Sequence, residues 1–265
     1  MRGRVLIVAG SDSGGGAGIQ ADIKTVTMLD AFAMTAITAL TAQNTNGVFG
    51  VLPIAPDFIR QQMEVVLDDL GADAVKTGML HDQAVIETVA AVLSDRAADV
   101  PLVLDPVMVA NGGAPLIEPQ AVDALKQILV PLAAVLTPNL PEAEILTGRR
   151  IDTIEAMKHA ADALLSLGCR AALLKGGHLD GPVVHDILVT QDGIREWENP
   201  RIDSRHTHGT GCTLASAIAA GLAQGLAIEA AVDRARDFVR HAIESAPGFG
   251  HGHGPLDHAH PLRKH

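Results

Sequence analysis

The chain has 265 residues, with 31 acidic and 20 basic side chains, and its net charge at neutral pH is −11. Nucleic-acid binding and acidic-membrane binding favour a basic surface, and single-strand binding relies on aromatic stacking, whereas this chain is 2% aromatic and has no tyrosine. No uncharged apolar run reaches the roughly 20 residues that a membrane span needs. These totals predict a globular protein that binds neither nucleic acid nor membrane.

The cysteines and the first residues indicate the compartment. Cys169 and Cys212 match neither a zinc spacing nor a disulfide framework, which favours a reducing environment. The opening apolar stretch is short and is followed by no small-residue cleavage site, so it does not resemble a signal peptide. We therefore expect a cytoplasmic protein.

Apolar runs alternate with amphipathic segments along most of the chain. The predicted strands are Arg4–Ala9, Met34–Leu40, Ala72–Lys76, Leu102–Leu104, Ala134–Leu136 and Ala171–Leu174, followed by a hairpin of Asp186–Thr190 and Ile194–Asn199. Apolar spacing of three and four residues predicts helices over Phe58–Leu70, Gln83–Ala97, Ala121–Leu129 and Ile228–Ala246. This order predicts one α/β domain over residues 1–250, with a mostly parallel sheet covered by helices on both faces.

A polar or glycine-rich segment follows the carboxyl end of each of the six predicted strands that precede the hairpin. They are residues 9–18, 41–47, 76–80, 104–108, 136–144 and 174–178. Ligands of parallel sheets bind beyond the carboxyl ends of the strands. The six segments together therefore predict one composite site.

The first of these segments contains glycines that fit part of a dinucleotide-binding pattern, Gly16 to Ala21. That pattern requires an acidic residue at the end of the second strand, and none is present. No phosphate-binding P-loop sequence occurs either. We expect the glycines to let the backbone approach a ligand while Asp22 points into the site. The alternative is that Asp22 is only a favourable carboxylate in the first turn of a helix.

The stretch HGTGCT at residues 208–213 predicts an anion site. Gly209 and Gly211, on either side of Thr210, permit positive φ, so successive N–H groups can converge at a helix N-terminus. The same position favours a thiolate and lowers a cysteine pKa, which makes Cys212 a candidate proton acceptor. The alternative for Cys212 is a small buried apolar side chain.

Other parts suited to phosphoryl transfer follow the later strands. Asp105, Asn139 and Glu142 offer oxygen atoms near the expected rim, and Mg²⁺ usually takes one or two protein carboxylates. Lys175 leaves an apolar strand immediately before two glycines and could offset phosphate charge.

The remaining candidate is the histidine-rich segment 251–265, which holds five histidines. It lacks the cysteine or acidic partners of a zinc site, so we expect a solvent-exposed C-terminal tail. His178 and His208 lie nearer the expected site and are possible phosphate or substrate contacts.

Seven segments, taken in order, resemble one known family. They are AGSDSGGGAGIQADIKT, ITALTAQNTNGV, VKTGML, VLDPVM, LTPNLPEAE, LLKGGH and HGTGCTLASAIAAGLAQG. They are similar to the hydroxymethylpyrimidine/phosphomethylpyrimidine kinases of thiamine biosynthesis, within the ribokinase-like superfamily. The resemblance implies a ribokinase-like three-layer sandwich that uses ATP and Mg²⁺. It implies phosphorylation of 4-amino-5-hydroxymethyl-2-methylpyrimidine and then of its monophosphate to the diphosphate.

The resemblance also implies roles for individual residues. The pyrimidine pocket would contain Gly10, Asp22, Gln43, Met79 and Val107; the ATP site Asn139, Lys175 and Thr210; the metal site Asp105 and Glu142; and the catalytic turn Gly209, Gly211 and Cys212. The wider superfamily has an aspartate base where this chain has Cys212.

Two further expectations come with the resemblance. Relatives are commonly dimers, and the small residues that follow Cys212 would permit a helix–helix interface in a homodimer. The alternative activity is that of a pyridoxal kinase, alone or as a second specificity, because some relatives with the same turn phosphorylate that vitamin. A non-catalytic sensor is less favoured, since Asp105, Glu142 and Cys212 are all present.

Overall fold

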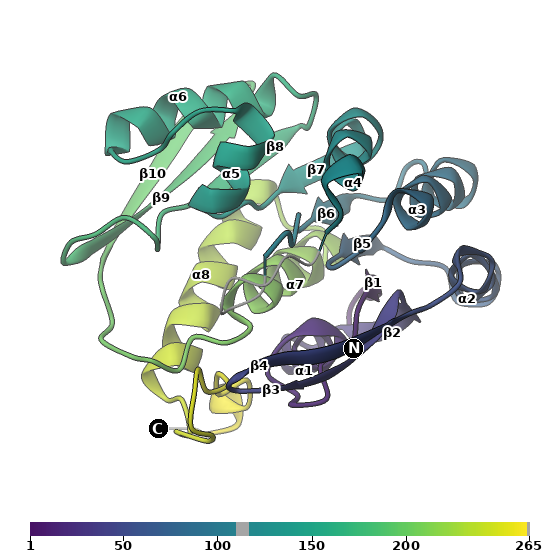
Figure 1. Cartoon of the computed structure of the whole chain (residues 1–265), viewed down its shortest axis with the longest axis horizontal. Coiled ribbons are helices and arrows are strands. Elements are labelled where there is room, and N and C mark those ends of the chain that lie inside the picture. The colour runs from purple at the N-terminus through teal and green to yellow at the C-terminus, as the bar shows by residue number, and fades with distance from the viewer. Residues whose placement is uncertain (110–116, 264–265) are drawn as a thin grey trace.

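The central sheet has eight strands and is mostly parallel (Figure 1). The computed structural model describes residues 1–109 and 117–263. In chain order the strands of the sheet are β1 (Arg4–Ala9), β2 (Phe32–Ile37), β5 (Ala74–Thr77), β6 (Leu102–Leu104), β7 (Ala133–Leu136), β8 (Ala171–Lys175), β9 (Val183–Thr190) and β10 (Gly193–Pro200). Their spatial order is β10-β9-β8-β7-β6-β5-β1-β2, and only the β8–β9 and β9–β10 pairings are antiparallel. The mostly parallel sheet and the late hairpin are confirmed.

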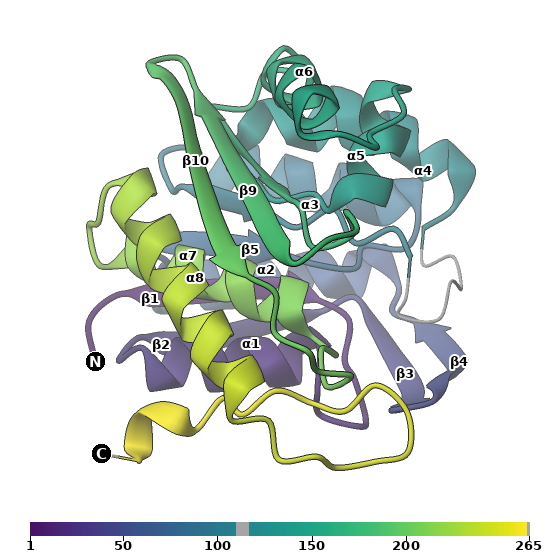
Figure 2. The ribbon, with the colours of Figure 1, turned by 90° about the vertical axis from the view of Figure 1, so that its left-hand side faces the viewer.

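Helices cover both faces of this sheet (Figure 2). One layer consists of α1 (Gly18–Met28), α7 (Thr210–Ala223) and α8 (Ile228–Glu244). The other consists of α2 (Pro56–Asp69), α3 (Gln83–Arg96), α4 (Pro119–Ala124), α5 (Leu140–Thr147) and α6 (Ile154–Leu165), with short turns η1 (Leu125–Leu129) and η2 (Val130–Leu132). Alternate residues of β1 enter different cores: Leu6 and Val8 face the α2–α6 layer, whereas Val5 and Ile7 face the α1–α7–α8 layer. The three-layer sandwich is confirmed.

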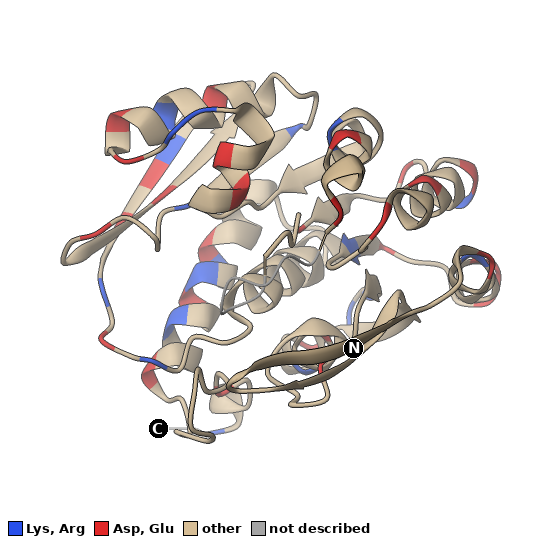
Figure 3. Ribbon diagram, in the orientation of Figure 1, with Lys and Arg blue, Asp and Glu red and all other residues tan. Residues whose placement is uncertain are grey.

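The predicted strand Met34–Leu40 divides into parts of two sheets. Thr38 is fully buried at the division, where its N–H donates to Ala9 O at 3.1 Å and its hydroxyl donates to Met79 O at 2.6 Å. Beyond it, β3 (Ala39–Asn44) pairs with β4 (Gly47–Pro53) in a separate antiparallel hairpin. The hairpin carries no Lys, Arg, Asp or Glu (Figure 3). No glycine or proline lies at this division, so the sequence pattern alone predicts a single strand there.

Helix α7 lies inside the protein rather than at its surface. Nine of its residues are buried between the sheet, α1 and α8. A Cβ at Gly221 would lie 2.7 Å from Ala231 Cβ, which shows how closely α7 and α8 approach. The helix–helix dimer interface expected on α7 is therefore wrong, because its small residues already pack internally. No helix in the described part of the chain is long and apolar enough to cross a membrane.

The solvent-exposed tail expected at 251–265 is also wrong for its central part. His208 N–H donates to Gly254 O at 3.1 Å, and Thr213 Oγ1 lies 2.9 Å from Nε2 of His258, which is 5% exposed. After α8 the segment runs along the edge of the molecule, and it ends in the short turn η3 (His260–Leu262). The last two residues of the expected tail lie outside the described residues. Sequence patterning missed this docking because only one of the three buried positions in its described part, Gly254, Leu256 and His258, carries a large apolar side chain.

Candidate active site

A cavity of about 470 Å³ lies where the parallel strands end. It collects twelve of the thirteen site residues expected from the sequence, which are Gly10, Gln43, Met79, Asp105, Val107, Asn139, Glu142, Lys175, Gly209, Thr210, Gly211 and Cys212. Asp22 is the exception. The expected composite rim is present because β1, β5, β6, β7 and β8 run in the same direction and end at the same edge.

The first turn of α7 forms one wall of this cavity. Gly209 precedes the helix at φ +84°, and a Cβ there would lie 1.9 Å from Gly16 O. A Cβ at Gly211 would lie 3.2 Å from Lys175 Nζ. Both glycines therefore allow other groups to approach the start of the helix, where unpaired N–H groups and the helix dipole favour an anion.

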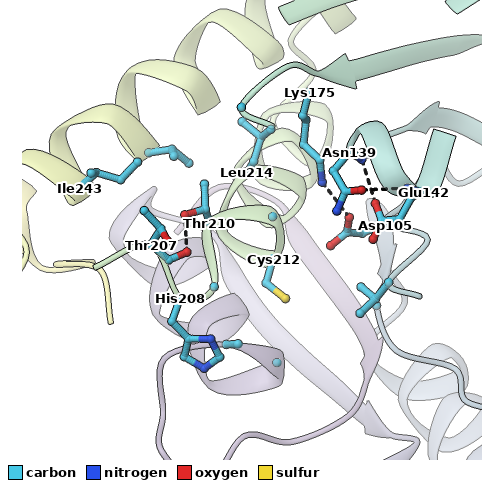
Figure 4. Close-up of a pocket in the computed structure, with 18 of the residues that line it drawn as sticks. Asp105, Asn139, Glu142, Lys175, Thr207, His208, Thr210, Cys212, Leu214 and Ile243 are labelled. Carbon is cyan, nitrogen blue, oxygen red and sulfur yellow. Dashed lines mark hydrogen bonds and ion pairs between the residues drawn. The ribbon is translucent and has the colours of Figure 1, made fainter. Parts of the chain in front are cut away.

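An ion pair faces this helix terminus. Lys175 Nζ lies 3.3 Å from Asp105 Oδ1, which also accepts a hydrogen bond from the Thr137 hydroxyl at 3.2 Å (Figure 4). Burial lowers the pKa of Lys175, but the negative charges of Asp105 and Glu142 outweigh this effect and raise it overall. The amine thus remains a cation. Asp105 Oδ2 is buried with no hydrogen-bond partner among the described residues.

Asn139 and Glu142 begin α5 as a capping box. Asn139 Oδ1 accepts the N–H of Glu142 at 2.9 Å, and Glu142 Oε2 accepts the N–H of Asn139 at 2.8 Å. Burial raises the pKa of Glu142, the charge of Asp105 raises it further, and Lys175 opposes both. The cap explains the spacing of the motif and fixes Glu142 close to Asp105.

Cys212 lies in the first turn of α7, and in Figure 4 its sulfur points between His208 and Asp105. The expected lowering of its pKa is wrong. Burial raises the pKa of the thiol to about 12; the charges of Asp22 and Asp105 act in the same direction, and Lys76 opposes them. Part of the side chain still faces the cavity. The thiolate is disfavoured because desolvation exceeds the small stabilisation that a helix terminus supplies.

Asp22 lies behind the cavity rather than in its lining. Its two carboxylate oxygens are 3.0 and 2.9 Å from Lys76 Nζ, and Ser216 Oγ donates to it at 2.7 Å. Both members of the ion pair are fully buried. Burial lowers the pKa of Lys76, but the charge of Asp22 outweighs this effect and raises it. Lys76 itself lines the cavity, and a lysine that ends a predicted buried strand was the signal for it.

The part of the cavity near the first loop contains Gly10 and Met79, two of the expected pyrimidine-pocket residues. A Cβ at Gly10 would lie 2.7 Å from Met79 Cε, so glycine allows Met79 to pack against the loop. Asp12, which sequence reasoning missed, lies beneath this part at 1% exposure and contacts His208 Nε2 at 2.9 Å. An acidic residue inside the glycine run was its signal in the sequence.

The end of the cavity between the β9–β10 hairpin and α8 was also missed, and it combines apolar with charged side chains, among them Arg236 and Arg240. Its apolar lining includes Pro200, the last residue of β10, together with Leu214 of α7 and Val239 and Ile243 of α8. Val239 and Ile243 belong to the apolar face that the sequence predicts for α8. Periodicity places such residues toward the protein interior but does not separate core positions from cavity positions.

Comparisons with known proteins match this chain over nearly its whole length. A family model described as phosphomethylpyrimidine kinase matches residues 12–257. The hydroxymethylpyrimidine/phosphomethylpyrimidine kinase of Bacillus subtilis is 47% identical over 96% of this chain and 94% of that protein. The thiamine biosynthesis bifunctional protein of Geobacter sulfurreducens is 51% identical over 97% of this chain, which spans only 52% of that longer protein.

Solved structures give the same fold. The Bacillus subtilis pyridoxal kinase bound to ADP has a TM-score of 0.91 at 36% identity, covering 99% of this chain and 100% of that chain. The phosphomethylpyrimidine kinase from Clostridium difficile has a TM-score of 0.81 at 41% identity, covering 91% and 99%. Because the family model and the sequence identity both extend over nearly the whole length, the chain belongs to the phosphomethylpyrimidine kinase family.

Proposed function

We propose that this chain is a kinase that transfers the γ-phosphoryl group of ATP to 4-amino-5-hydroxymethyl-2-methylpyrimidine and then to the resulting monophosphate. Family membership supports an ATP-dependent phosphotransferase, and the names of the relatives supply the pyrimidine. The observation that carries the proposal is one cavity in which the first turn of α7 faces Lys175 and Asp105, with Gln43 at one end. The two free cysteines suit a reducing cytoplasm.

The proposed reaction uses positioning and charge more than covalent chemistry. Gln43, Met79 and Val107 would hold the ring so that its hydroxymethyl oxygen points toward the start of α7. The N–H groups there would receive the migrating phosphoryl group, and Lys175 would offset its charge. The end lined by Leu214, Val239 and Ile243 would accept the base of ATP.

The residues near Asp105 fit a magnesium ion. Mg²⁺ prefers oxygen ligands, takes few protein carboxylates and keeps several waters. Asp105 offers a buried carboxylate oxygen that lacks a hydrogen-bond partner among the described residues, with Glu142 close by. We propose that Asp105 holds the ion and that Glu142 and Asn139 support it. When bound, the ion supplies charge neutralisation at the ATP phosphates.

Cys212 is the group placed to accept the proton of the nucleophile. Its raised pKa means that the thiol is protonated at neutral pH in the absence of ligands. A loose phosphoryl-transfer transition state demands little from a base, so the backbone amides contribute the larger share in this proposal. Only the small thiolate fraction of Cys212 can take this proton, because the thiol already carries one; the S–H so formed then loses its proton to solvent before the next turnover.

The test is ADP release measured with three acceptors: the pyrimidine alcohol, its monophosphate and pyridoxal. We expect turnover with both pyrimidines and dependence on added Mg²⁺. A preference for pyridoxal above tenfold would overturn the assignment. No turnover with either pyrimidine would reject the proposed function altogether.

Pyridoxal phosphorylation is the second candidate. A specific observation favours it: the pyridoxal kinase of Staphylococcus aureus bound to AMP-PCP and pyridoxal has a TM-score of 0.89 at 35% identity. The higher sequence identity of the pyrimidine kinases, 47% for the Bacillus subtilis protein, favours the pyrimidine. The three-acceptor assay separates the two activities and also detects a dual specificity.

We further propose a homodimer, now through the β3–β4 hairpin instead of α7. Phe49 is 72% exposed and Leu52 is 61% exposed on a hairpin that carries no charged side chain. A two-stranded sheet is marginally stable alone, and a second copy of the same hairpin would cover these side chains. Sedimentation velocity should give a dimer that Phe49→Glu converts to a monomer; a monomeric wild-type protein would contradict this.

A further inference from the structure

The carboxamide of Gln43 makes two polar contacts inside the cavity. Its Nε2 lies 3.2 Å from His208 Nε2, and its Oε1 lies 3.3 Å from Thr41 Oγ1. A carboxamide has a donor end and an acceptor end of nearly the same shape, so its neighbours decide which end points where. Each neighbour can therefore be examined for the proton that it carries.

His208 carries a proton on Nε2 because that atom faces a carboxylate. Asp12 accepts the N–H groups of Gly14, Gly16 and Ala17 at 2.7, 3.0 and 2.8 Å. Burial raises the pKa of Asp12, but the hydrogen bonds from His208 and the backbone outweigh burial and lower it. An ionised Asp12 only accepts, so the 2.9 Å contact between its Oδ2 and His208 Nε2 requires an N–H on the imidazole.

Thr41 has no hydroxyl proton left for Gln43. Its Oγ1 donates to Ser11 O at 2.8 Å, which is shorter than its 3.3 Å contact with the carboxamide. The single hydroxyl hydrogen is thereby used, and Oγ1 offers lone pairs to its other neighbours. In the structure, the Nε2 donor of Gln43 faces the N–H donor of His208, and the Oε1 acceptor of Gln43 faces the lone pairs of Thr41 Oγ1. Exchanging the two ends of the carboxamide lets its nitrogen donate to Thr41 Oγ1, and lets its oxygen share the His208 N–H with Asp12 in a three-centre hydrogen bond whose shorter arm goes to Asp12.

We propose that Asp12 and His208 are positioning residues that hold the Gln43 carboxamide with its oxygen toward His208 and its nitrogen toward Thr41. One N–H and one lone pair of Gln43 then remain for a ligand, in a fixed order along the cavity wall. A ring with an amino group beside a ring nitrogen matches this order in one orientation only. This inference rests on the proposed function, because the ring in question is the aminopyrimidine.

The surrounding backbone holds this arrangement rigidly. Ser13 Oγ donates to Gln43 O and accepts Gln43 N–H, both at 2.8 Å, so the first loop clamps the residue that carries the carboxamide. A Cβ at Gly16 would lie 2.5 Å from His208 Cδ2, so glycine lets the imidazole lie directly on the loop. His208 is 8% exposed, and the hydrogen bonds are therefore largely shielded from water.

The test compares two ligands of inverted polarity by isothermal titration calorimetry without ATP. One is the 4-amino alcohol; the other is 5-hydroxymethyl-2-methylpyrimidin-4(3H)-one, which has an acceptor where the first has a donor, and the reverse at the ring nitrogen. We expect wild type to prefer the amino compound by at least about 100-fold, because the inverted edge places like groups together. In His208→Phe the preference should fall at least about tenfold, and His208→Gln, which keeps a donor, should retain it.

Two further variants complete the test. Thr41→Val removes the acceptor for the Gln43 nitrogen and should also lower the preference, which covers the case in which His208→Phe fails to fold. His159→Phe, at an exposed histidine of α6 outside the cavity lining, should leave the preference unchanged. An unchanged preference in His208→Phe or Thr41→Val would overturn the inference. Because only binding is compared, that result would be distinct from an absence of turnover, which would reject the proposed function.

Discussion

Replacing Gly209 with alanine should separate the two segments that meet at the start of α7. Gly209 has φ +84°, and a Cβ there would lie 1.9 Å from Gly16 O and 3.2 Å from Ala17 Cα. Gly225, just beyond the other end of α7, has φ +81° with nothing within 4 Å of an added Cβ. The two alanine variants thus share the same backbone strain, and only the first adds a steric clash.

The magnitudes follow from this pair. A left-handed conformation costs an alanine about 1–2 kcal/mol, so Gly225→Ala should lose about that much stability. In Gly209→Ala the oxygen lies well inside the ~3.5 Å of a comfortable contact, and the segments must part by roughly 1.5 Å. Overpacking of this kind costs about 1–3 kcal/mol more, for a total of roughly 2–5 kcal/mol. Because a misplacement of ~1 Å can cost about 100-fold in rate, turnover should fall by that factor or more.

Urea unfolding gives the stability of both variants, and ADP release with the pyrimidine alcohol gives their turnover. We expect Gly225→Ala to keep turnover within about threefold of wild type, since it lies outside the cavity lining. If Gly209→Ala matched Gly225→Ala in both stability and turnover, the contact between the first loop and α7 would not organise the site, and the reasoning would be refuted.

Three other predictions concern titratable groups. Asp22→Asn leaves the fully buried cation of Lys76 without its partner and should cost about 3–5 kcal/mol in urea unfolding, whereas Asp73→Asn in a partly exposed pair should cost about 1 kcal/mol or less. Burial lowers the pKa of His258 to about 4, against about 6.5 in the unfolded chain. Roughly 3 kcal/mol of stability should therefore be present above pH 6.5 and lost as the pH falls toward 4. His258→Gln should flatten this pH dependence of stability, and parallel curves for variant and wild type would contradict it. Cys212→Ser should lose most of the turnover at unchanged ATP KM, and the wild-type rate should keep rising above pH 9 because the thiol pKa is about 12; near-normal turnover in the variant would rule out the base role.

Much of the fold could be predicted because its elements carry local signals. The apolar face predicted for α8 is buried at Ala231, Val232, Ala235, Phe238, Val239 and Ala242, as the spacing required. The hairpin predicted around residues 191–193 pairs as β9 and β10. The errors fell where no local signal exists: the division at Thr38 and the docked C-terminal segment. Long-range hydrogen bonds decide both, and periodicity contains no information about them.

The site residues, like the fold, were predicted correctly where the signal is local and wrongly where it is not. Strand ends and glycine turns could be identified from residue types, and twelve of the thirteen expected residues line one cavity. Asp22 was misplaced because the sequence does not reveal that Lys76 lies directly against it, 54 residues away. The pKa of Cys212 was predicted in the wrong direction because the helix terminus is a local feature, whereas desolvation comes from the segments packed around it.

The sequence by itself determined the order of elements, the alternation that requires a parallel sheet, and the residue types gathered at its carboxyl edge. Only the tertiary structure decided which of those residues face the cavity, which are paired behind it, and which neighbours the Gln43 carboxamide contacts. The physical reason is that burial, ionisation and hydrogen-bond direction depend on neighbours brought together by folding, such as Asp12 and His208, 196 residues apart. Backbone propensity and apolar spacing reflect interactions among residues a few positions apart, so they do not contain these long-range effects.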